Sequence, residues 1–188
     1  VAPCMPLQLF RRSETSRRLR LGEVTQQLSE DLTALAKATS PELVGKRQCL
    51  ASMSGDIQKQ LQLILHVFTD VADASEKNSM HAPGSDAYTS EEAAELLVDI
   101  FKLDLPARLV ASLGQLEFEI RKDVLSMFSA IVRLGPLSGA DKQLREYTTR
   151  QPEFFKLLVE GYDRPDIADQ CGVMLRSCAR HAMLVEAF

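Results

Sequence analysis

The sequence predicts an all-α protein, and three observations support that prediction. Apolar residues recur at spacings of three and four along nearly the whole chain, which is the period of a helix with one buried face. Glycine and proline are sparse, at 9 and 8 of 188 residues, and most of them lie between the periodic stretches. No stretch alternates apolar and polar residues in the manner of a half-buried strand. We therefore expect helices joined by turns.

Two long helices are expected in the N-terminal part of the chain. The first covers residues 21–38, and the second follows Ser40 and Pro41, which suit the N-cap and the first turn of a helix. Gly45 and Gly55 are the points at which the second helix could be interrupted. Spacings of three and four define the inward faces, which are formed by Val24, Leu28, Leu32, Leu35, Ile57, Leu61, Ile64, Leu65, Phe68 and Val71.

A mobile loop is expected over residues 75–88, because this stretch has no apolar period and is rich in turn-forming residues. Thr89 or Ser90 then caps the next helix, since a hydroxyl side chain ahead of acidic residues is typical of a helix N-terminus. Glu91 and Glu92 would lie at the positive end of the helix dipole.

Shorter helices are expected in the rest of the chain. We place them at 90–101, 104–113, 117–133, 140–149, 153–160 and from 163 onward. Gly135 and Pro136 are expected to end the third of these helices, because proline disrupts a helix interior. Their inward faces are formed by Ala93, Leu96, Leu97, Ile100, Phe101, Leu109, Val110, Leu113, Ile120, Val124, Met127, Phe128, Ile131, Ile167, Cys171, Met174, Leu175 and Cys178.

An internal repeat appears when the last third of the chain is shifted by 47 residues onto the middle third. Gly114 falls on Gly161, and the apolar positions coincide, as in Ile120 with Ile167 and Met127 with Met174. A period of about 40–47 residues is typical of HEAT and armadillo repeats. The alternative is that two unrelated amphipathic helices match by chance at some offset. We favour an armadillo/HEAT-like α-solenoid, a right-handed superhelix of two- and three-helix repeats.

The repeat also identifies a candidate binding face. A helical wheel places two sets of residues opposite the apolar faces, and the same offset of 47 relates the sets: Lys122, Ser126, Ser129 and Arg133, then Asp169, Val173, Arg176 and Arg180. We call these eight residues the ladder face. The last helix of each three-helix unit lines the concave, partner-binding surface of such a solenoid. The alternative is a solvated face that binds nothing.

No pattern of catalytic or metal-binding residues is present. Cys171, Cys178 and His181 share one helix face, but seven residues of helix separate the two cysteines by about 10 Å. Two thiolates on one zinc ion lie within about 4 Å of each other. We therefore expect both cysteines, and also His66, to be core residues. The sequence predicts no enzymatic activity, no cofactor, no metal site and no small-molecule substrate.

Charge and composition narrow the possible partners and location. A formal net charge of −4 argues against a nucleic-acid partner, which needs a dense basic face. No stretch approaches the roughly 18 apolar residues of a transmembrane helix. Four cysteines without a CxxC pair are typical of a reducing compartment, so a cytoplasmic location is expected.

The first 20 residues differ from the rest in charge. They contain one acid, Glu14, and five arginines, at positions 11, 12, 17, 18 and 20. This segment could be an organelle transit segment, a segment that docks on anionic lipid or on an acidic partner, or a solvated terminus. We favour a basic, disordered segment over 1–20 that precedes a helical-repeat domain over 21–188.

Several runs resemble the Mo-25 family, also called calcium-binding protein 39. The strongest run is Gly-Tyr-Asp-x-Pro-Asp-Ile-Ala-x-x-Cys-Gly-x-Met-Leu-Arg-x-Cys-x-Arg-His over residues 161–181. A second is Leu-Glu-Phe-Glu-Ile-Arg-Lys-Asp-Val over 116–124. Residues 5–10 are similar to the start of that family, which would make Met5 the first residue.

The resemblance implies a cytoplasmic armadillo-like scaffold without catalytic activity. Such a scaffold binds a kinase or pseudokinase of the sterile-20-like type, holds it in an active-like conformation, and so activates serine/threonine kinase signalling. The resemblance also implies a chain truncated at its C-terminus, because the family continues beyond the equivalent of Phe188. The alternative is a truncated helical-repeat protein with a structural or adaptor role, directed to a membrane or organelle by its basic N-terminus.

Overall fold

The computed structural model describes residues 7–38, 47–76, 87–138, 141–181 and 184. Over these residues the chain forms helices and no strand. The elements are α1 (Leu7–Ala38), α2 (Arg47–Glu76), α3 (Ser90–Lys102), α4 (Leu105–Ser112), the 3-10 helix η2 (Leu113–Gln115), α5 (Phe118–Ser138), α6 (Asp141–Arg150), α7 (Glu153–Tyr162) and α8 (Ala168–Ala179). The all-α prediction is therefore confirmed.

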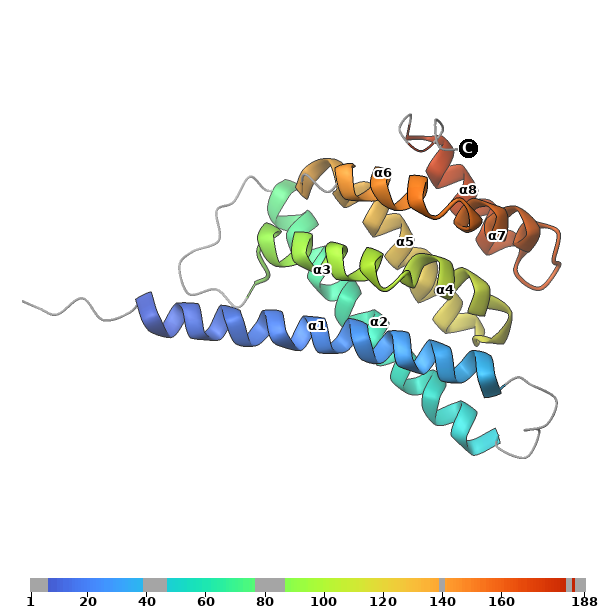
Figure 1. Ribbon diagram of the computed structural model, residues 1–188, viewed down its shortest axis with the longest axis horizontal. Helices are drawn as coiled ribbons and strands as arrows, with labels where there is room; N and C mark the ends of the chain where they lie inside the picture. The colour runs from blue at the N-terminus through green and yellow to red at the C-terminus, as the bar shows by residue number, and fades with distance from the viewer. Residues whose placement is uncertain (1–6, 39–46, 77–86, 139–140, 182–183, 185–188) are drawn as a thin grey trace, which may run out of the picture.

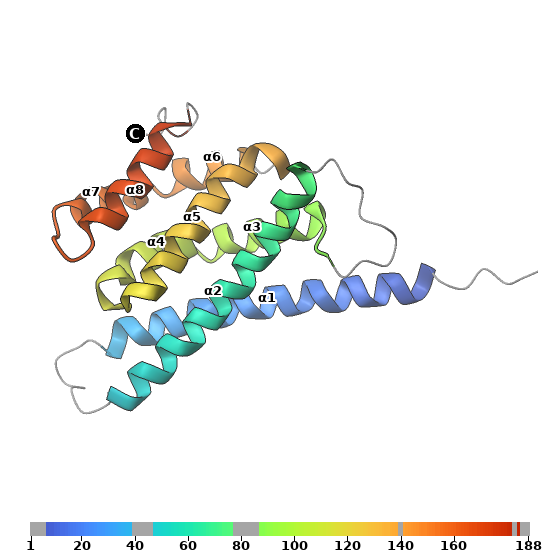
Figure 2. The same cartoon turned by 180° about the vertical axis from the view of Figure 1, so that it is seen from behind.

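The helices stack as successive units in two layers. The helices α1, α3, α4, α6 and α7 form one layer, and α2, α5 and α8 lie behind them (Figures 1 and 2). Each helix of the unit α3–α5 contacts its counterpart in the unit α6–α8: α3 packs on α6, α4 on α7, and α5 on α8. Before them, α1 packs on α3 and α4, and α2 packs on α5. The predicted solenoid of two- and three-helix repeats is confirmed.

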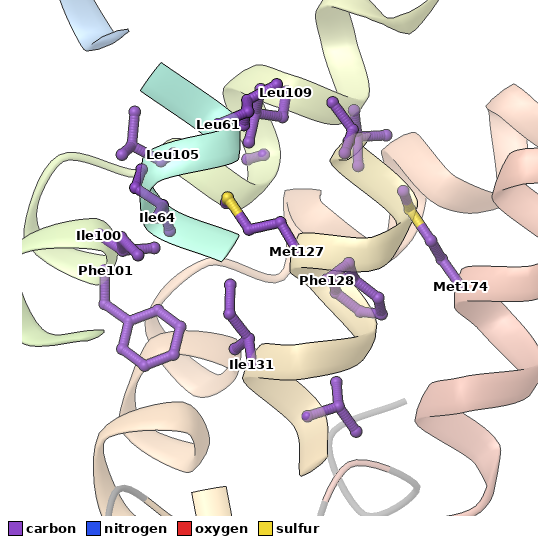
Figure 3. Close-up of a cluster of buried hydrophobic side chains, with 14 of the residues drawn as sticks. Leu61, Ile64, Ile100, Phe101, Leu105, Leu109, Met127, Phe128, Ile131 and Met174 are labelled. Atoms are coloured by element: carbon purple, nitrogen blue, oxygen red, sulfur yellow. The ribbon is translucent and has the colours of Figure 1, made fainter. Parts of the chain in front are cut away.

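The inward faces form one continuous core across the units. Side chains from α2, α3, α4, α5 and α8 meet in it, among them Leu61, Ile100, Leu109, Met127 and Met174 (Figure 3). Burial of a large apolar side chain contributes about 1.5–3 kcal/mol. Most predicted inward residues are buried, whereas Val24, Leu65 and Leu175 are only partly buried against the core.

The start of α3 is a capping box. The Thr89 hydroxyl accepts a hydrogen bond from the backbone N–H of Glu92 at 3.2 Å, and the Thr89 N–H donates to the Glu92 carboxylate at 2.9 Å. This arrangement satisfies two backbone donors that a helix N-terminus otherwise leaves unpaired. Of the two capping residues that the sequence allowed, Thr89 is the N-cap.

Asp104 links two consecutive units. It is the N-cap of α4 and adopts a left-handed backbone conformation, with φ of 56°. Its carboxylate accepts a hydrogen bond at 2.7 Å from the hydroxyl of Tyr147, a residue of α6. Aspartate tolerates this conformation better than most residues do. The Tyr147 hydroxyl in turn accepts from the Ala107 N–H at 3.2 Å.

The structure corrects two predicted helix boundaries. Residues 7–20 are helical, so α1 begins at Leu7 where we expected a disordered segment followed by a helix from residue 21. The reason is that 7–20 contains no glycine or proline and is rich in leucine and arginine, which favour helix. In addition, α5 continues through Pro136 to Ser138. Pro136 lies in the last turn of α5, so the hydrogen bond that its missing N–H costs is at the end of the helix and does not interrupt its interior.

The remaining expectations concern the interior of α2, the segments between the long helices, and membrane-spanning helices. Gly55 does not interrupt α2, which is continuous from Arg47 to Glu76. The predicted cap at Ser40–Pro41, Gly45 and most of the loop predicted over 75–88 lie outside the described residues. Within the helices that the structure describes, none is long and apolar enough to cross a membrane.

Candidate partner-binding face

The ladder face lies on the outward sides of two helices that pack against each other. Lys122, Ser126, Ser129 and Arg133 lie on α5, and Asp169, Val173, Arg176 and Arg180 lie on or directly after α8. All are exposed except Val173, which is half-buried. The opposite sides of the same helices are buried in the core, for example at Val124 and Cys171. The structure therefore brings the eight predicted residues onto the accessible side of one packed helix pair.

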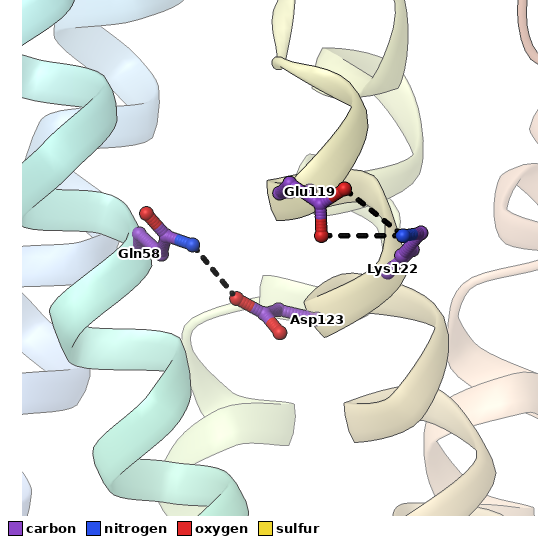
Figure 4. A network of polar contacts seen from close by, with 4 residues as sticks. All are labelled: Gln58, Glu119, Lys122 and Asp123. Carbon is purple, nitrogen blue, oxygen red and sulfur yellow. Dashed lines mark hydrogen bonds and ion pairs between the residues drawn. The ribbon is translucent and has the colours of Figure 1, made fainter.

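Lys122 is held in place by its own helix. Its ammonium group contacts both carboxylate oxygens of Glu119, at 2.9 and 3.2 Å (Figure 4). It also lies 4.6 Å from the ring centroid of Phe118, which is 60% exposed. A cation over an exposed aromatic ring contributes about 0.5–1 kcal/mol. The positive charge of Lys122 is therefore largely matched by its neighbours.

On one side, α2 borders the ladder face. The side-chain amides of Gln58 and Gln62 both point at the carboxylate of Asp123 on α5, each at 3.5 Å, and Figure 4 shows the contact from Gln58. These are long hydrogen bonds, so each is weak. They nevertheless show that polar side chains, as well as the apolar core, join α2 to α5.

On the other side, Arg121 joins α5 to the start of α8. Its Nε donates to the carbonyl of Leu116 at 2.8 Å, and its Nη1 donates to the carbonyl of Asp166. Arg164 forms an ion pair with the Asp166 carboxylate at 3.0 Å. Sequence reasoning did not assign Arg121 a role, although it belongs to the run 116–124 on which the resemblance rests.

The repeated glycines allow close packing at equivalent positions. A Cβ added to Gly161 would collide with the sulfur of Cys171, and a Cβ added to Gly114 would collide with the guanidinium of Arg164. Both positions of the repeat therefore favour a residue without a Cβ. The crowding side chain differs, because Cys171 belongs to the same unit as Gly161, whereas Arg164 belongs to the unit after that of Gly114.

The cysteines of α8 are buried and form no metal cluster. Cys171 and Cys178 are free thiols with no exposed surface. Burial raises the pKa of the Cys178 thiol to about 12, and burial also raises the pKa of the Cys171 thiol. Both thiols are therefore protonated near neutral pH, which makes them poor nucleophiles and poor metal ligands. Among the residues that the structure describes, no group of three or more His, Cys, Asp or Glu side chains could hold a metal ion.

His66 is not a core residue, contrary to our expectation. Its side chain is 62% exposed, and its Nδ1 lies 3.4 Å from the Asp70 carboxylate. Its ring meets Tyr88 edge-on, with the ring centroids 5.8 Å apart. The neighbouring apolar residues misled the prediction, because His66 lies opposite the buried stripe of α2.

Comparisons with known proteins give a consistent result. Residues 9–188 match the family model described as Mo25-like. The chain is 35% identical over 97 residues to the human calcium-binding protein 39-like, a stretch covering 52% of this chain and 28% of the human protein. It is 36% identical over 103 residues to MO25-like protein 2 of Caenorhabditis elegans, covering 54% of this chain and 30% of that protein.

A fungal relative matches to a similar extent. The Mo25-like protein of Schizosaccharomyces pombe is 36% identical over 93 residues, which cover 50% of this chain and 28% of that protein. The matched part thus spans less than a third of the length of these relatives. Since the family model covers nearly the whole chain, the chain belongs to the Mo25-like family.

Proposed function

We propose that the chain is a non-catalytic scaffold that binds and activates a kinase or pseudokinase of the sterile-20-like type. The observation that carries the proposal is the alignment of outward-facing side chains on α5 and α8, which pack side by side in equivalent positions of two repeats. Membership of the Mo25-like family supports the same function. In this proposal the ladder face is the surface that contacts the kinase.

The mechanism that we propose is a shift in the conformational population of the kinase. A rigid face activates a kinase if it binds the active-like conformation more tightly than the inactive one. A difference of about 100-fold in affinity stabilises the favoured conformation by about 2.7 kcal/mol. The continuous core beneath α5 and α8 supports such rigidity, because both helices are anchored along their whole inward faces.

The proposal includes a cytoplasmic location and no cofactor, metal, nucleic acid or small-molecule substrate. The net charge of −4 and the buried, protonated thiols of α8 support this part of it. The chain would act through its surface rather than through a reactive group.

A bulky residue on the ladder face tests the proposal. Ser129→Trp places a large ring on the exposed side of α5, and Thr149→Trp places the same ring on an exposed position of α6 in the other layer. We expect Ser129→Trp to weaken binding to a sterile-20-like kinase by about tenfold or more, because close approach is prevented, and Thr149→Trp to leave it unchanged. Binding is measured by pull-down and activation by phosphate transfer, with human calcium-binding protein 39-like as a reference. Equal binding by both variants, or no activation by the unaltered chain, would contradict the proposal.

The second candidate is a structural or adaptor protein directed to a membrane or organelle by its basic N-terminus. The observation that favours it is that α1 begins at Leu7, so the five arginines of the first 20 residues lie along one helix. Imaging of the tagged chain with and without Arg11→Gln, Arg12→Gln and Arg17→Gln tests this candidate. An unchanged cytosolic signal would remove it.

A further inference from the structure

Most cationic side chains that the structure describes are held by an acid or a carbonyl group. The ion pairs are Arg18 with Glu95, Lys59 with Asp56, Lys102 with Asp99, Lys122 with Glu119, Lys142 with Glu146, Lys156 with Glu153, and Arg164 with Asp166. Arg133, Arg176 and Arg180 behave differently, because none of their side chains forms a hydrogen bond or ion pair with a described residue. Apart from Lys37 in the last turn of α1, these three unpaired cations all lie on the ladder face.

The three arginines lie together at the C-terminal ends of two packed helices. Arg176 and Arg180 are four residues apart, which is about 6 Å along the helix axis. Arg133 on α5 is the repeat equivalent of Arg180 after α8. Because α5 packs on α8, and the axes of packed helices lie about 8–10 Å apart, the two arginines are expected to be neighbours. Residues 126–138 and 170–181 contain no aspartate or glutamate. These helix ends therefore carry three arginines and no acid, whereas the exposed Asp169 lies at the other end of α8 and the chain as a whole has a net charge of −4.

We propose that Arg133, Arg176 and Arg180 bind an acidic, extended segment of a protein partner. The inference rests on the proposed function, since it specifies the chemistry of the partner at the same face. A guanidinium group forms paired hydrogen bonds with a carboxylate, and exposed arginines that no described residue engages can do so. In an extended segment, carboxylates two or three residues apart are about 7–10 Å from each other. That spacing matches the expected separation of the arginines.

Carboxylates fit this face better than a single phosphate group or a lipid surface. One phosphate binds guanidinium groups that converge on a point, whereas these arginines start from two helices and from successive turns. Binding to a lipid surface is strengthened by exposed apolar side chains next to the cations. Of the large exposed apolar residues of the described chain, which are Leu19, Phe118, Val159 and Tyr162, none belongs to 126–138 or 170–181. The ring of Tyr162 does lie against Gly172, beside the guanidinium of Arg176, but one aromatic side chain offers little apolar surface for insertion into a membrane.

A labelled peptide tests the inference directly. The probe alternates glutamate and glycine over about 12 residues, long enough to span about 40 Å when extended. We expect the unaltered chain to bind it at low salt. The triple variant Arg133→Gln, Arg176→Gln, Arg180→Gln should bind it about 10- to 100-fold more weakly. This range follows because each exposed ion pair contributes about 2- to 5-fold in affinity, and three are lost. The readout is fluorescence anisotropy, and circular dichroism checks that each variant is folded.

A second triple variant controls for net charge. Lys102→Gln, Lys142→Gln and Lys156→Gln remove the same charge from α3, α6 and α7, where each lysine already has an acidic partner. This variant should bind the peptide within about twofold of the unaltered chain. An equal loss in both triple variants would overturn the inference, since attraction to net charge alone would explain it. So would tighter binding of a peptide with one phosphoserine, or arginine-dependent binding to vesicles of anionic lipid.

The kinase pull-down separates this inference from the proposed function. If the kinase binds the unaltered chain and the triple arginine variant binds it more weakly, both are supported. If both forms bind the kinase equally, the acidic-segment inference is wrong and the scaffold function stands. If the peptide binds through the arginines but no kinase binds, the inference stands and the proposed function is wrong.

Discussion

Several polar links join the unit α3–α5 to the unit α6–α8, and two of them lie in different surroundings. In the first, Tyr147 of α6 is 1% exposed, stacks on Phe101 at 5.1 Å, and donates its hydroxyl to Asp104. Burial and the bond to Asp104 raise the pKa of Tyr147 well above its ordinary value. In the second, the half-exposed Arg121 reaches the carbonyl of Asp166. Loss of the buried link should affect stability most, because water can replace the contacts of the exposed one.

The largest effect is expected at Tyr147. Tyr147→Ala removes an aromatic side chain from the core and should lower the free energy of unfolding by about 3–5 kcal/mol. Tyr147→Phe keeps the ring but leaves the Asp104 carboxylate and the Ala107 N–H without this partner, so we expect a loss of about 1–3 kcal/mol. Urea unfolding measures both changes. If Tyr147→Phe were as stable as the unaltered chain, the hydroxyl would play no part in joining the two units.

The repeated glycines offer the same contrast in a matched pair. Gly161→Ala should lower the free energy of unfolding by about 1–3 kcal/mol, because the new methyl group meets the buried sulfur of Cys171. Gly114→Ala meets the flexible guanidinium of the exposed Arg164, which can move away, so a change of less than about 1 kcal/mol is expected. Thermal unfolding of both variants provides the comparison.

A second substitution sharpens the interpretation of Gly161. Cys171→Ala makes room for the added methyl group, so it should cost less stability in the Gly161→Ala background than in the unaltered chain. Equal costs in the two backgrounds would show that the collision with the sulfur is not the cause.

The sequence predicted the inward faces well because hydrophobic periodicity is a local property. Val124 and Cys171 could be placed in the core from their own helices, and the same wheels placed Arg133 and Arg176 outside. The link from Tyr147 to Asp104 could not be predicted in this way. It joins residues 43 positions apart, and it depends on how the units pack rather than on any pattern within one helix.

The errors in the prediction have two origins, one in tertiary packing and one in a local property of the sequence. His66 follows apolar residues along the chain, but the packing of α2 decides which side of the helix is covered, and His66 lies on the other side. The early start of α1 at Leu7 was missed because the arginines of the first 20 residues were interpreted by charge alone. Their helix propensity was the more informative property.

A small effect on global stability is also expected at Arg121. Arg121→Ala removes the hydrogen bonds to the carbonyls of Leu116 and Asp166, and a loss of about 0.5–1.5 kcal/mol is expected because the site is partly exposed. The local effect should be clearer than the global one. Amide exchange should become faster over 163–167, the segment that Arg121 holds at the start of α8. Arg121→Lys keeps the charge but not the paired geometry of the guanidinium, so it should restore exchange protection only in part. If exchange over 163–167 were unchanged in Arg121→Ala, packing alone would position the start of α8, and the exposed link from Arg121 would play no part in joining these two units.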